Sequence, residues 1–409
     1  MKPTGPQLTV FLSVVALISY VFVIAPKVAE RQNADAVAEA LGLGSGDDSQ
    51  HGGGQSQEPQ LFPAAGKRFI GVTTKEGAFD FKPVDAFEDT TGTKPSVMMF
   101  NEGWVNAKFD RSPFDKIAKR GMLPMLSWEP WNYKDDSVDD NGTHADQPDY
   151  KLSAITAGEH DAYLKAYAKG VKNLKYEVAI RLAHEMNGFW YPWGANVNGN
   201  KPGDYVKMWK HVRGIFQAEG VKNVTWVWST NVVLDNKLDL ADYYPGDDQV
   251  DWVGISGYYG TAGTENYRTP GAIFDATLKA LKKVTDRPIV ITETGATNQS
   301  GQRTKWIGDF FDYLPKHKEI IGFIWYEAVK ELDWRLASTP KSAQAFGKEA
   351  GAAPFQVTWS GSMLPNNDPP TWGTGATPSS SPSPSTSSSK KSSKKPKSSK
   401  SASSSPSTD

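Results

Sequence analysis

The sequence predicts a (β/α)8 barrel, or TIM barrel, flanked by extensions that lack a core. Short β-branched or aromatic runs alternate with amphipathic helical stretches, as in an α/β fold with a parallel sheet. There are eight such runs, the number that closes a barrel of this kind. Polar and aromatic residues gather where the runs end, and parallel barrels keep their functional groups at that rim.

Each expected element follows from local periodicity. The predicted strands occupy residues 68–72, 96–100, 123–128, 177–184, 224–229, 252–256, 288–292 and 320–325. The amphipathic stretches between them predict helices at residues 113–120, 158–173, 202–219 and 270–284. Short connections between such elements bring the C-terminal ends of all the strands to one rim.

Composition excludes several classes of protein. The chain has 409 residues, enough for one barrel with appendages or for two average domains. Its formal net charge of -1 provides no field that attracts nucleic acid, so no such partner is expected. It has no cysteine, which excludes disulfides, thiolate nucleophiles and cysteine-ligated metals. Its 14 tryptophans favour a stacking surface for a flat ligand.

The N-terminal region predicts export. Lys2 precedes an uncharged, mostly apolar run at residues 8–25, just long enough to cross a thin bilayer as a helix. Residues 1–28 are therefore expected to be a cleaved signal peptide or a retained membrane anchor, and both alternatives stay open. Residues 29–64 are expected to be a linker, because residues 42–60 contain hardly any apolar side chain. The protein is then secreted or anchored to the outer face of the cell membrane.

The barrel domain is expected over residues 65–370. Residues 371–409 are rich in Ser, Pro and Lys, and this composition predicts a disordered tail. Its clustered lysines suit loose association with an anionic cell-wall polymer, but we favour a solvated extension without a specific partner. We find no solenoid repeat and expect a monomer.

One segment combines a proton donor with aromatic rings. The string Arg181-Leu-Ala-His-Glu-Met-Asn-Gly-Phe-Trp-Tyr-Pro-Trp-Gly194 ends the fourth predicted strand. Cleavage of a glycosidic bond needs a proton donor at its oxygen, and sugar rings offer flat C–H faces that bind aromatic side chains. Glu185 provides the donor, and Trp190 and Trp193 provide the rings. The competing interpretation is structural, with Glu185 simply paired to Arg181.

A second carboxylate favours the catalytic interpretation. Glu293 ends the seventh predicted strand, before a glycine turn. Period-two alternation places Glu293 on one face with Ile291. It likewise places Glu185 with Arg181, so both acids are expected to point into the barrel mouth. Carboxyls about 5 Å apart make one acid a nucleophile and retain the anomeric configuration, whereas about 6.5 to 9.5 Å admits a water and inverts it. We expect the shorter spacing.

Three further acids lie at the same predicted rim. Glu102, Glu129 and Glu327 follow the second, third and eighth strands and are rivals for either catalytic role. No metal or other cofactor is expected. The His-Glu-Met-Asn-Gly string lacks the second histidine that a helical zinc site requires.

Four strings together resemble glycoside hydrolase family 26. They are Arg181-Leu-Ala-His-Glu-Met-Asn-Gly, Trp190-Tyr-Pro-Trp193, Val250-Asp-Trp-Val-Gly-Ile-Ser-Gly-Tyr258 and Ile291-Thr-Glu-Thr-Gly-Ala296, within a match over residues 68–337. The resemblance implies a (β/α)8 barrel that cleaves chiefly β-1,4-mannans with retention. It implies Glu185 as acid/base and Glu293 as nucleophile. It also implies that His184 shapes the site, Tyr258 hydrogen-bonds the nucleophile and Trp325 forms the floor under the sugar.

The third strand departs from the mannanases of that family. They typically carry a histidine near its end, where this chain has Trp128-Glu-Pro-Trp131. Glu129 is therefore a substrate-binding candidate in place of the histidine. This version looks more like family members that act on mixed-linkage β-glucan.

The aromatic residues divide by position. Trp131, Trp190, Trp193 and Trp325 are the predicted sugar-stacking residues, and Tyr258 is preferred to Tyr259 because alternation turns only one of the two rings inward. Residues within strands are expected in the core, namely Trp226, Trp228 and Trp252.

The sequence therefore predicts a retaining endo-β-glycanase with a polysaccharide substrate. We expect β-1,4-mannan as its substrate, with mixed-linkage β-1,3-1,4-glucan as the alternative. The non-enzymatic alternative is a catalytically inactive polysaccharide-binding protein that kept the aromatic cleft.

Overall fold

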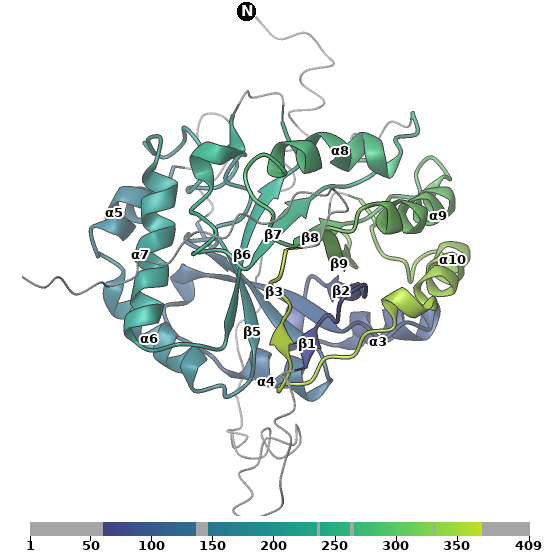
Figure 1. Ribbon diagram of the computed structural model, residues 1–409, viewed down its shortest axis with the longest axis horizontal. Coiled ribbons are helices and arrows are strands. Elements are labelled where there is room, and N and C mark those ends of the chain that lie inside the picture. Colours follow the sequence, from purple (N-terminus) through teal and green to yellow (C-terminus); the bar gives the residue numbers. More distant parts are fainter. Residues whose placement is uncertain (1–59, 136–145, 235–237, 262–265, 331, 370–409) are drawn as a thin grey trace, which may run out of the picture. The chain divides into compact units, whose positions relative to one another are not determined.

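The computed structural model describes residues 60–135, 146–234, 238–261, 266–330 and 332–369 (Figure 1). These residues form a closed barrel of parallel strands, which confirms the predicted (β/α)8 fold. In chain order the barrel strands are β2 (Phe69–Thr73), β3 (Val97–Gly103), β4 (Leu123–Glu129), β5 (Val178–Leu182), β6 (Val224–Asn231), β7 (Trp252–Ser256), β8 (Ile289–Thr294) and β9 (Ile320–Tyr326).

All the predicted strands are present, with shifts at their ends. β7 has the predicted bounds, whereas β3, β6 and β8 extend further toward the C-terminal rim than expected. β5 is shorter than expected and ends at Leu182, so His184 and Glu185 lie beyond the strand. The rim that carries the candidate acids is therefore built from both strand ends and irregular backbone.

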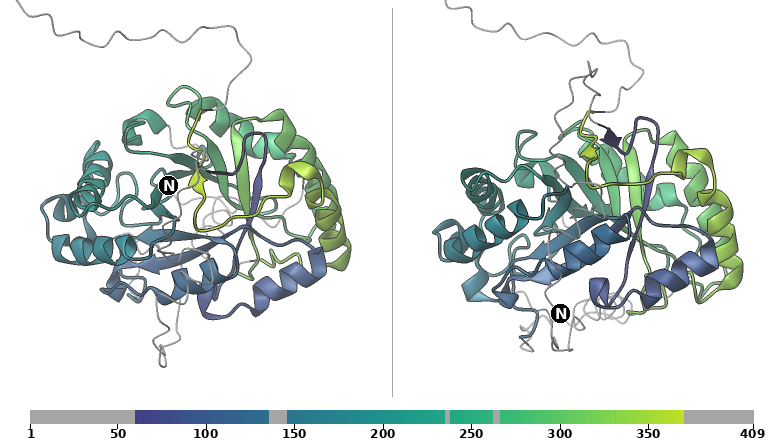
Figure 2. Two further views of the ribbon diagram at one scale, coloured as in Figure 1. Left: turned by 60° about the horizontal axis from the view of Figure 1, so that its bottom comes forward. Right: turned by 90° about the horizontal axis from the view of Figure 1, so that it is seen from below.

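Helices surround the barrel (Figure 2). The four predicted helices are confirmed, although α6 begins later than expected because a separate short helix and a turn precede it. α8 begins where the Thr269 hydroxyl accepts a hydrogen bond from the Ala272 N–H, and Pro270 takes the first helical position. The α-helices are α3 (Lys82–Thr91), α4 (Ser112–Lys119), α5 (Leu152–Thr156), α6 (Asp161–Lys172), α7 (Asp204–Ala218), α8 (Pro270–Leu281), α9 (Arg303–Tyr313) and α10 (Pro340–Ala350).

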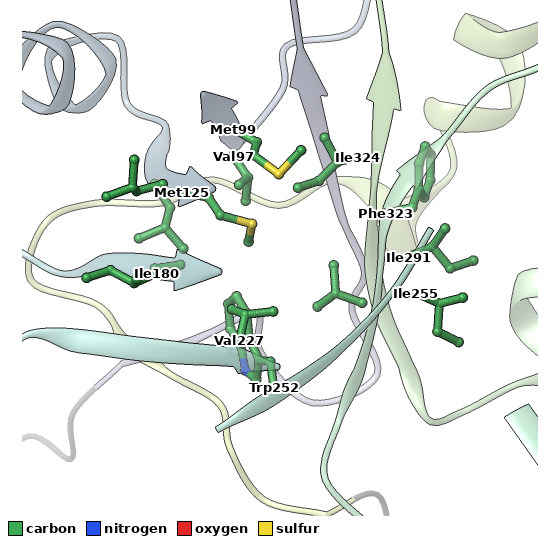
Figure 3. Packing of buried hydrophobic residues seen from close by; sticks show 14 of the residues in the cluster. Val97, Met99, Met125, Ile180, Val227, Trp252, Ile255, Ile291, Phe323 and Ile324 are labelled. Atoms are coloured by element: carbon green, nitrogen blue, oxygen red, sulfur yellow. The ribbon is translucent and has the colours of Figure 1, made fainter. Parts of the chain in front are cut away.

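Apolar side chains fill the interior of the barrel below the C-terminal rim. Alternate residues of each strand point inward, and Figure 3 shows Val97, Met99 and Ile324 close together. A Cβ built at Gly71 would press on Ile324 and Val97, so β2 needs glycine at this point. Nearer the rim the inward side chains become polar, beginning with Ser127 of β4. The candidate site therefore rests on an apolar core.

Aromatic rings close the N-terminal end of the barrel. A small sheet of β1 (Leu61–Phe62) and β10 (Leu364–Pro365) lies beside it. Phe62 stacks on Phe69 with ring centroids 5.6 Å apart, and Phe69 packs against Trp252 at 5.6 Å. Aromatic rings thus occupy the N-terminal end of the barrel, and the polar side chains converge at the opposite end, the C-terminal rim.

The expected extensions fall mostly outside the described residues. Residues 61–62 were predicted to belong to a linker, but they form β1 because Phe62 is buried against the barrel. The expectations for residues 1–28, 29–59 and 371–409 lie outside the described ranges, so export and tail disorder stay predictions. In the part of the chain that is described, no helix is both long and apolar enough to cross a membrane.

The contact between α3 and α10 provides a test of the packing. A Cβ at Gly347 of α10 would overlap the carbonyl oxygen of Thr91, a backbone atom that cannot rotate away. We predict that Gly347→Ala lowers the free energy of unfolding by about 2 kcal/mol, measured by urea denaturation.

Gly308→Ala in α9 is the matched control for this substitution. A Cβ at Gly308 meets no heavy atom within 4 Å, so this variant should be unchanged or more stable by up to about 1 kcal/mol. Equal stability of the two variants would contradict the described packing.

Candidate active site

Two predicted acids converge on one buried cation at the C-terminal rim. Arg181, on the inward face of β5, has no exposed side-chain surface. Its Nη1 donates to Glu293 Oε1 at 2.6 Å, and its Nη2 lies 3.9 Å from Glu185 Oε1. The structural interpretation of the sequence paired Arg181 with Glu185 alone. The closer partner is Glu293, so one guanidinium connects the two carboxylates.

Two inward hydroxyl groups also contact the guanidinium. Arg181 Nη2 donates to Ser256 Oγ at 2.8 Å, and Nη1 also donates to Ser127 Oγ at 3.2 Å. Burying a charged group is costly unless charged or polar partners surround it. Ser127 belongs to β4, which adjoins β5, whereas Ser256 belongs to β7, which does not, so the surroundings of Arg181 depend on closure of the barrel.

Glu185 reaches the site through an irregular segment after β5. Ala183 has a φ of 45° and Glu185 has a φ of 56°, backbone angles that residues other than glycine rarely adopt. Hydrogen bonds hold this backbone, with Glu185 N–H donating to Ser229 O at 2.7 Å and Tyr205 Oη donating to Ala183 O at 3.0 Å. The expected strand alternation does not place Glu185, because β5 has already ended.

Glu293 is turned inward by a β-bulge in β8. Ser256 of β7 lies opposite Glu293, whereas the preceding residue of β7 faces both Ile291 and Thr292. The extra residue reverses the alternation, a known effect of bulges near functional sites. The prediction that Glu293 shares a face with Ile291 is therefore wrong, although its conclusion that Glu293 faces the mouth is right. Thr292 also turns inward, and its hydroxyl lies 2.9 Å from that of Ser229.

The two carboxylates have different surroundings. Burial raises the pKa of Glu185, the nearby charge of Glu293 raises it further, and Arg181 opposes both effects. Trp190 Nε1 donates to Glu185 Oε2 at 3.0 Å. One oxygen of Glu293 instead accepts a charge-assisted hydrogen bond from Arg181. The other oxygen accepts a hydrogen bond from Tyr258 Oη at 2.7 Å. One acid is thus favoured as a proton carrier, and the other accepts hydrogen bonds on both oxygens.

His184 directly precedes Glu185 and is buried. Burial lowers the pKa of its imidazole well below the usual value, so the ring is neutral near pH 7. Its Nδ1 lies 3.2 Å from Ser127 Oγ and its Nε2 lies 3.2 Å from Tyr191 Oη. The neutral ring thus joins two hydroxyl groups and supports the segment that carries Glu185.

The predicted stacking tryptophans at residues 131 and 193 are internal. Trp193 is fully buried, stacks on Tyr191 at a centroid distance of 4.4 Å, and donates from Nε1 to His184 O. Trp131 is 3% exposed and meets Tyr191 and Trp193 edge-on. The prediction that these two rings offer a sugar-binding face is wrong, because other rings cover them. Trp190, at 8% exposed, lies closer to the surface and contacts Glu185 directly.

Trp325 also differs from its predicted place as a floor under the sugar. It lies on the outer face of β9, fully buried between Trp306 of α9 and Phe346 of α10. Its Nε1 donates to the carbonyl oxygen of Trp334 at 3.1 Å. The ring beside the inward Tyr258 is instead Trp334, with centroids 4.9 Å apart. Strand alternation around residue 325 could have indicated this outward position.

Two of the rival acids have structural surroundings. Glu327 accepts hydrogen bonds from the N–H groups of Leu336 and Ala337 at 2.8 and 3.0 Å, so it organises the loop after β9. Burial raises the pKa of Glu327 to about 7. Glu102 points away from the barrel axis toward Tyr167 of α6, and burial raises its pKa to about 8. Neither contacts Arg181.

The third rival, Glu129, lies on the inward face of β4 and is buried. Its oxygens accept hydrogen bonds from Asn101 Nδ2 at 2.6 Å and Trp131 Nε1 at 2.9 Å. Burial raises the pKa of Glu129 to about 7, while these hydrogen bonds and Arg181 oppose the rise. Asn101, Ser127 and Ser256 were not predicted as site residues, although each occupies an inward position near a strand end.

The residues that the structure describes contain no group of three or more His, Cys, Asp or Glu that could hold a metal ion. The side chains described above supply carboxylates, one guanidinium, one imidazole, hydroxyls, an indole and an amide. These groups can transfer protons, and they can stabilise or attack a carbon on which positive charge develops.

Comparison with known proteins assigns the family. The sequence pattern of Glycosyl hydrolase family 26 matches residues 119–328, about half of the chain. The chain belongs to glycosyl hydrolase family 26. This membership confirms the predicted family and the predicted class, a glycoside hydrolase.

Two proteins similar to this chain have different names. The chain is 29% identical over 324 residues to endoglucanase H of Acetivibrio thermocellus, covering 77% of the chain and 32% of the relative. It is 26% identical over 252 residues to a mannan endo-1,4-beta-mannosidase of Bacillus subtilis, covering 54% and 64%. The chain thus spans about a third and just under two thirds of the lengths of these two relatives.

A solved structure supports the fold. The family 26 β-mannanase BoMan26A of Bacteroides ovatus superposes with a TM-score of 0.55 at 19% identity, covering 71% of this chain and 90% of that structure. At this identity the superposition supports the barrel architecture alone.

The electrostatic coupling of the two acids provides a test. Glu293→Gln removes the negative charge that raises the pKa of Glu185, so we predict that the pKa of Glu185 falls. The measurement is a carbon NMR titration of protein labelled at the glutamate carboxyl carbons, with Glu185→Gln to assign the signal.

Glu102→Gln is the control, because Glu102 lies at the same rim but points away from the barrel axis. This variant should leave the pKa of Glu185 unchanged. An unaltered or higher pKa in the Glu293→Gln protein would show that the two carboxylates are not coupled as described.

Proposed function

We propose that this chain is a retaining endo-β-glycanase that hydrolyses β-1,4-mannan-type polysaccharide by double displacement. Glu185 is the acid/base and Glu293 the nucleophile. The observation that carries this proposal is the shared contact of both carboxylates with buried Arg181, combined with their different hydrogen-bonding surroundings. The mannan assignment is supported by the mannan endo-1,4-beta-mannosidase among the relatives.

The first step forms a glycosyl ester. An oxygen of Glu293 attacks the anomeric carbon, the bond from that carbon to the glycosidic oxygen breaks, and Glu185 donates its proton to the leaving oxygen. The raised pKa of Glu185 favours the protonated form that this step requires. Tyr258 and Arg181 hold the two oxygens of Glu293, which fixes the direction of attack.

The second step uses the change in charge. Once Glu293 is an ester it has lost its negative charge, so the pKa of Glu185 falls and its carboxylate form becomes available. Glu185 then takes a proton from water as the water oxygen attacks the anomeric carbon and releases Glu293. Two displacements at one carbon restore the original configuration.

A β-glucan is the second candidate substrate. Endoglucanase H matches a larger part of this chain, at higher identity, than the mannosidase does. The catalytic steps are the same for both sugars, which differ in the orientation of a hydroxyl group. The choice therefore depends on the residues around the catalytic pair.

A nucleophile test addresses the mechanism. We predict that Glu293→Ala lowers kcat/KM by at least about 10³-fold, because the attacking atom is lost. Added azide should restore turnover and give a glycosyl azide with inverted configuration, identified by proton NMR. Glu102→Gln serves as the control and should need no azide, because Glu102 points away from the barrel axis. Azide rescue that gives only the retained configuration would exchange the roles assigned to the two acids.

A polysaccharide screen addresses the substrate. We expect the purified protein to release oligosaccharides from linear β-1,4-mannan faster than from lichenan, and not to cleave xylan. Faster cleavage of lichenan would favour the β-glucanase alternative. Binding of these polymers without any hydrolysis would show that the chain is a polysaccharide-binding protein and overturn the proposed activity.

A further inference from the structure

A carboxylate and an amide form a fixed pair beside the catalytic acids. Asn101 of β3 lies next to Ser127 of β4 in the strand register, and Ser127 contacts Arg181. Asn101 Nδ2 donates to Glu129 Oε1 at 2.6 Å, a short bond between an amide and a carboxylate. Both side chains of the pair lie on the inward face of the barrel, Glu129 on the same strand as Ser127 and Asn101 one strand further from β5.

Glu129 is unsuited to bind a ligand itself. It is 2% exposed, and each of its oxygens already accepts a hydrogen bond from a protein group. A carboxylate can accept from Asn101 and Trp131 at the same time, whereas a glutamine would turn an N–H toward one of these donors. Its chemistry is that of a double acceptor that holds two neighbouring side chains.

Asn101 has the opposite character. It is only partly buried, and among the described residues its side chain has no hydrogen-bonding partner other than Glu129. The bond to Glu129 fixes which end of the amide carries nitrogen, so Oδ1 and the second N–H have defined positions. An amide held this way presents one acceptor and one donor, a combination that matches two adjacent hydroxyl groups of a sugar ring.

The loops behind the pair keep it in place. The Trp131 N–H donates to Glu129 O at 2.9 Å, and the Val105 N–H donates to Trp131 O at 3.3 Å. A Cβ at Gly103 would collide with the ring of Tyr133, so the loops after β3 and β4 pack directly on each other. The orientation of Asn101 is therefore set before any ligand binds.

We propose that Asn101 is a substrate-binding residue that hydrogen-bonds two neighbouring hydroxyls of a neutral pyranose, and that Glu129 is the positioning residue that orients its amide. This assignment rests on the proposed glycanase function and adds a determinant of sugar recognition to it. It also changes the role predicted for Glu129, from a direct contact with substrate to a contact made through Asn101.

The test compares single and double variants on the best polysaccharide from the screen. Loss of two neutral hydrogen bonds predicts that Asn101→Ala lowers kcat/KM by about 10- to 100-fold. Glu129→Gln should lower kcat/KM to a similar extent, and the double variant should be no worse than Asn101→Ala alone. Asn106→Ala is the matched control, because Asn106 lies after β3 and its described side-chain contact is a hydrogen bond accepted from Tyr133 Oη at 2.9 Å.

A second readout separates recognition from folding. The wild-type protein should cleave an aryl β-glycoside faster than its 2-deoxy or 3-deoxy analogue, and Asn101→Ala should reduce at least one of these preferences toward unity. Thermal unfolding identifies any variant that fails to fold, and in that case Asn101→Ser gives the same comparison with a smaller change.

The outcomes distinguish the two proposals. A normal kcat/KM in Asn101→Ala would overturn the pairing. The same holds if the decreases in kcat/KM caused by Glu129→Gln and Asn101→Ala add fully in the double variant. Either result would leave the glycanase function intact. Absence of hydrolysis by the wild-type protein would overturn the proposed function, and with it the substrate role of Asn101.

Discussion

The buried guanidinium of Arg181 is the interaction on which the site depends. It is surrounded by Glu293, Ser256 and Ser127, with Glu185 at a longer distance, so groups from β4, β5, β7 and β8 meet at one charge. A charge without exposed surface is costly unless charged and polar partners surround it, and here they bind both terminal nitrogens of the guanidinium. Closure of the barrel therefore brings the two candidate carboxylates to this charge, and loss of any one partner leaves more of the charge uncompensated.

Both acids reach Arg181 through departures from regular strand geometry. Glu185 follows β5 on a backbone with positive φ, and Glu293 follows a bulge in β8. Regular strands would place side chains alternately inside and outside, and neither acid is placed by that rule. The hydrogen bonds from the Glu185 backbone to Ser229 and from the Tyr205 hydroxyl to Ala183 hold the strained segment. The fold thus uses local irregularity to direct two side chains from separate strands to one point.

Much of this arrangement could be predicted from the sequence. Runs of β-branched and aromatic residues located every barrel strand, and the rim position of Glu185 and Glu293 followed from where those runs end. The bulge at residues 291–292 could not be predicted, because an extra residue in a strand changes neither its composition nor its hydrophobicity. The burial of Trp131 and Trp193 could also not be predicted, because it depends on their contacts with Tyr191 and with aromatic rings of another loop. For Trp325 the sequence did contain a signal that contradicted the predicted position, namely the alternation of side chains along β9.

The account centres on Glu293 as the residue that bonds covalently to the sugar. The most direct measurement is mass spectrometry of the wild-type protein after incubation with a 2-deoxy-2-fluoro glycosyl fluoride, which slows the second displacement and traps the ester. The account predicts one added glycosyl group, on the peptide that contains Glu293. A label on Glu129 or Glu327, or continued hydrolysis with no covalent adduct, would contradict it.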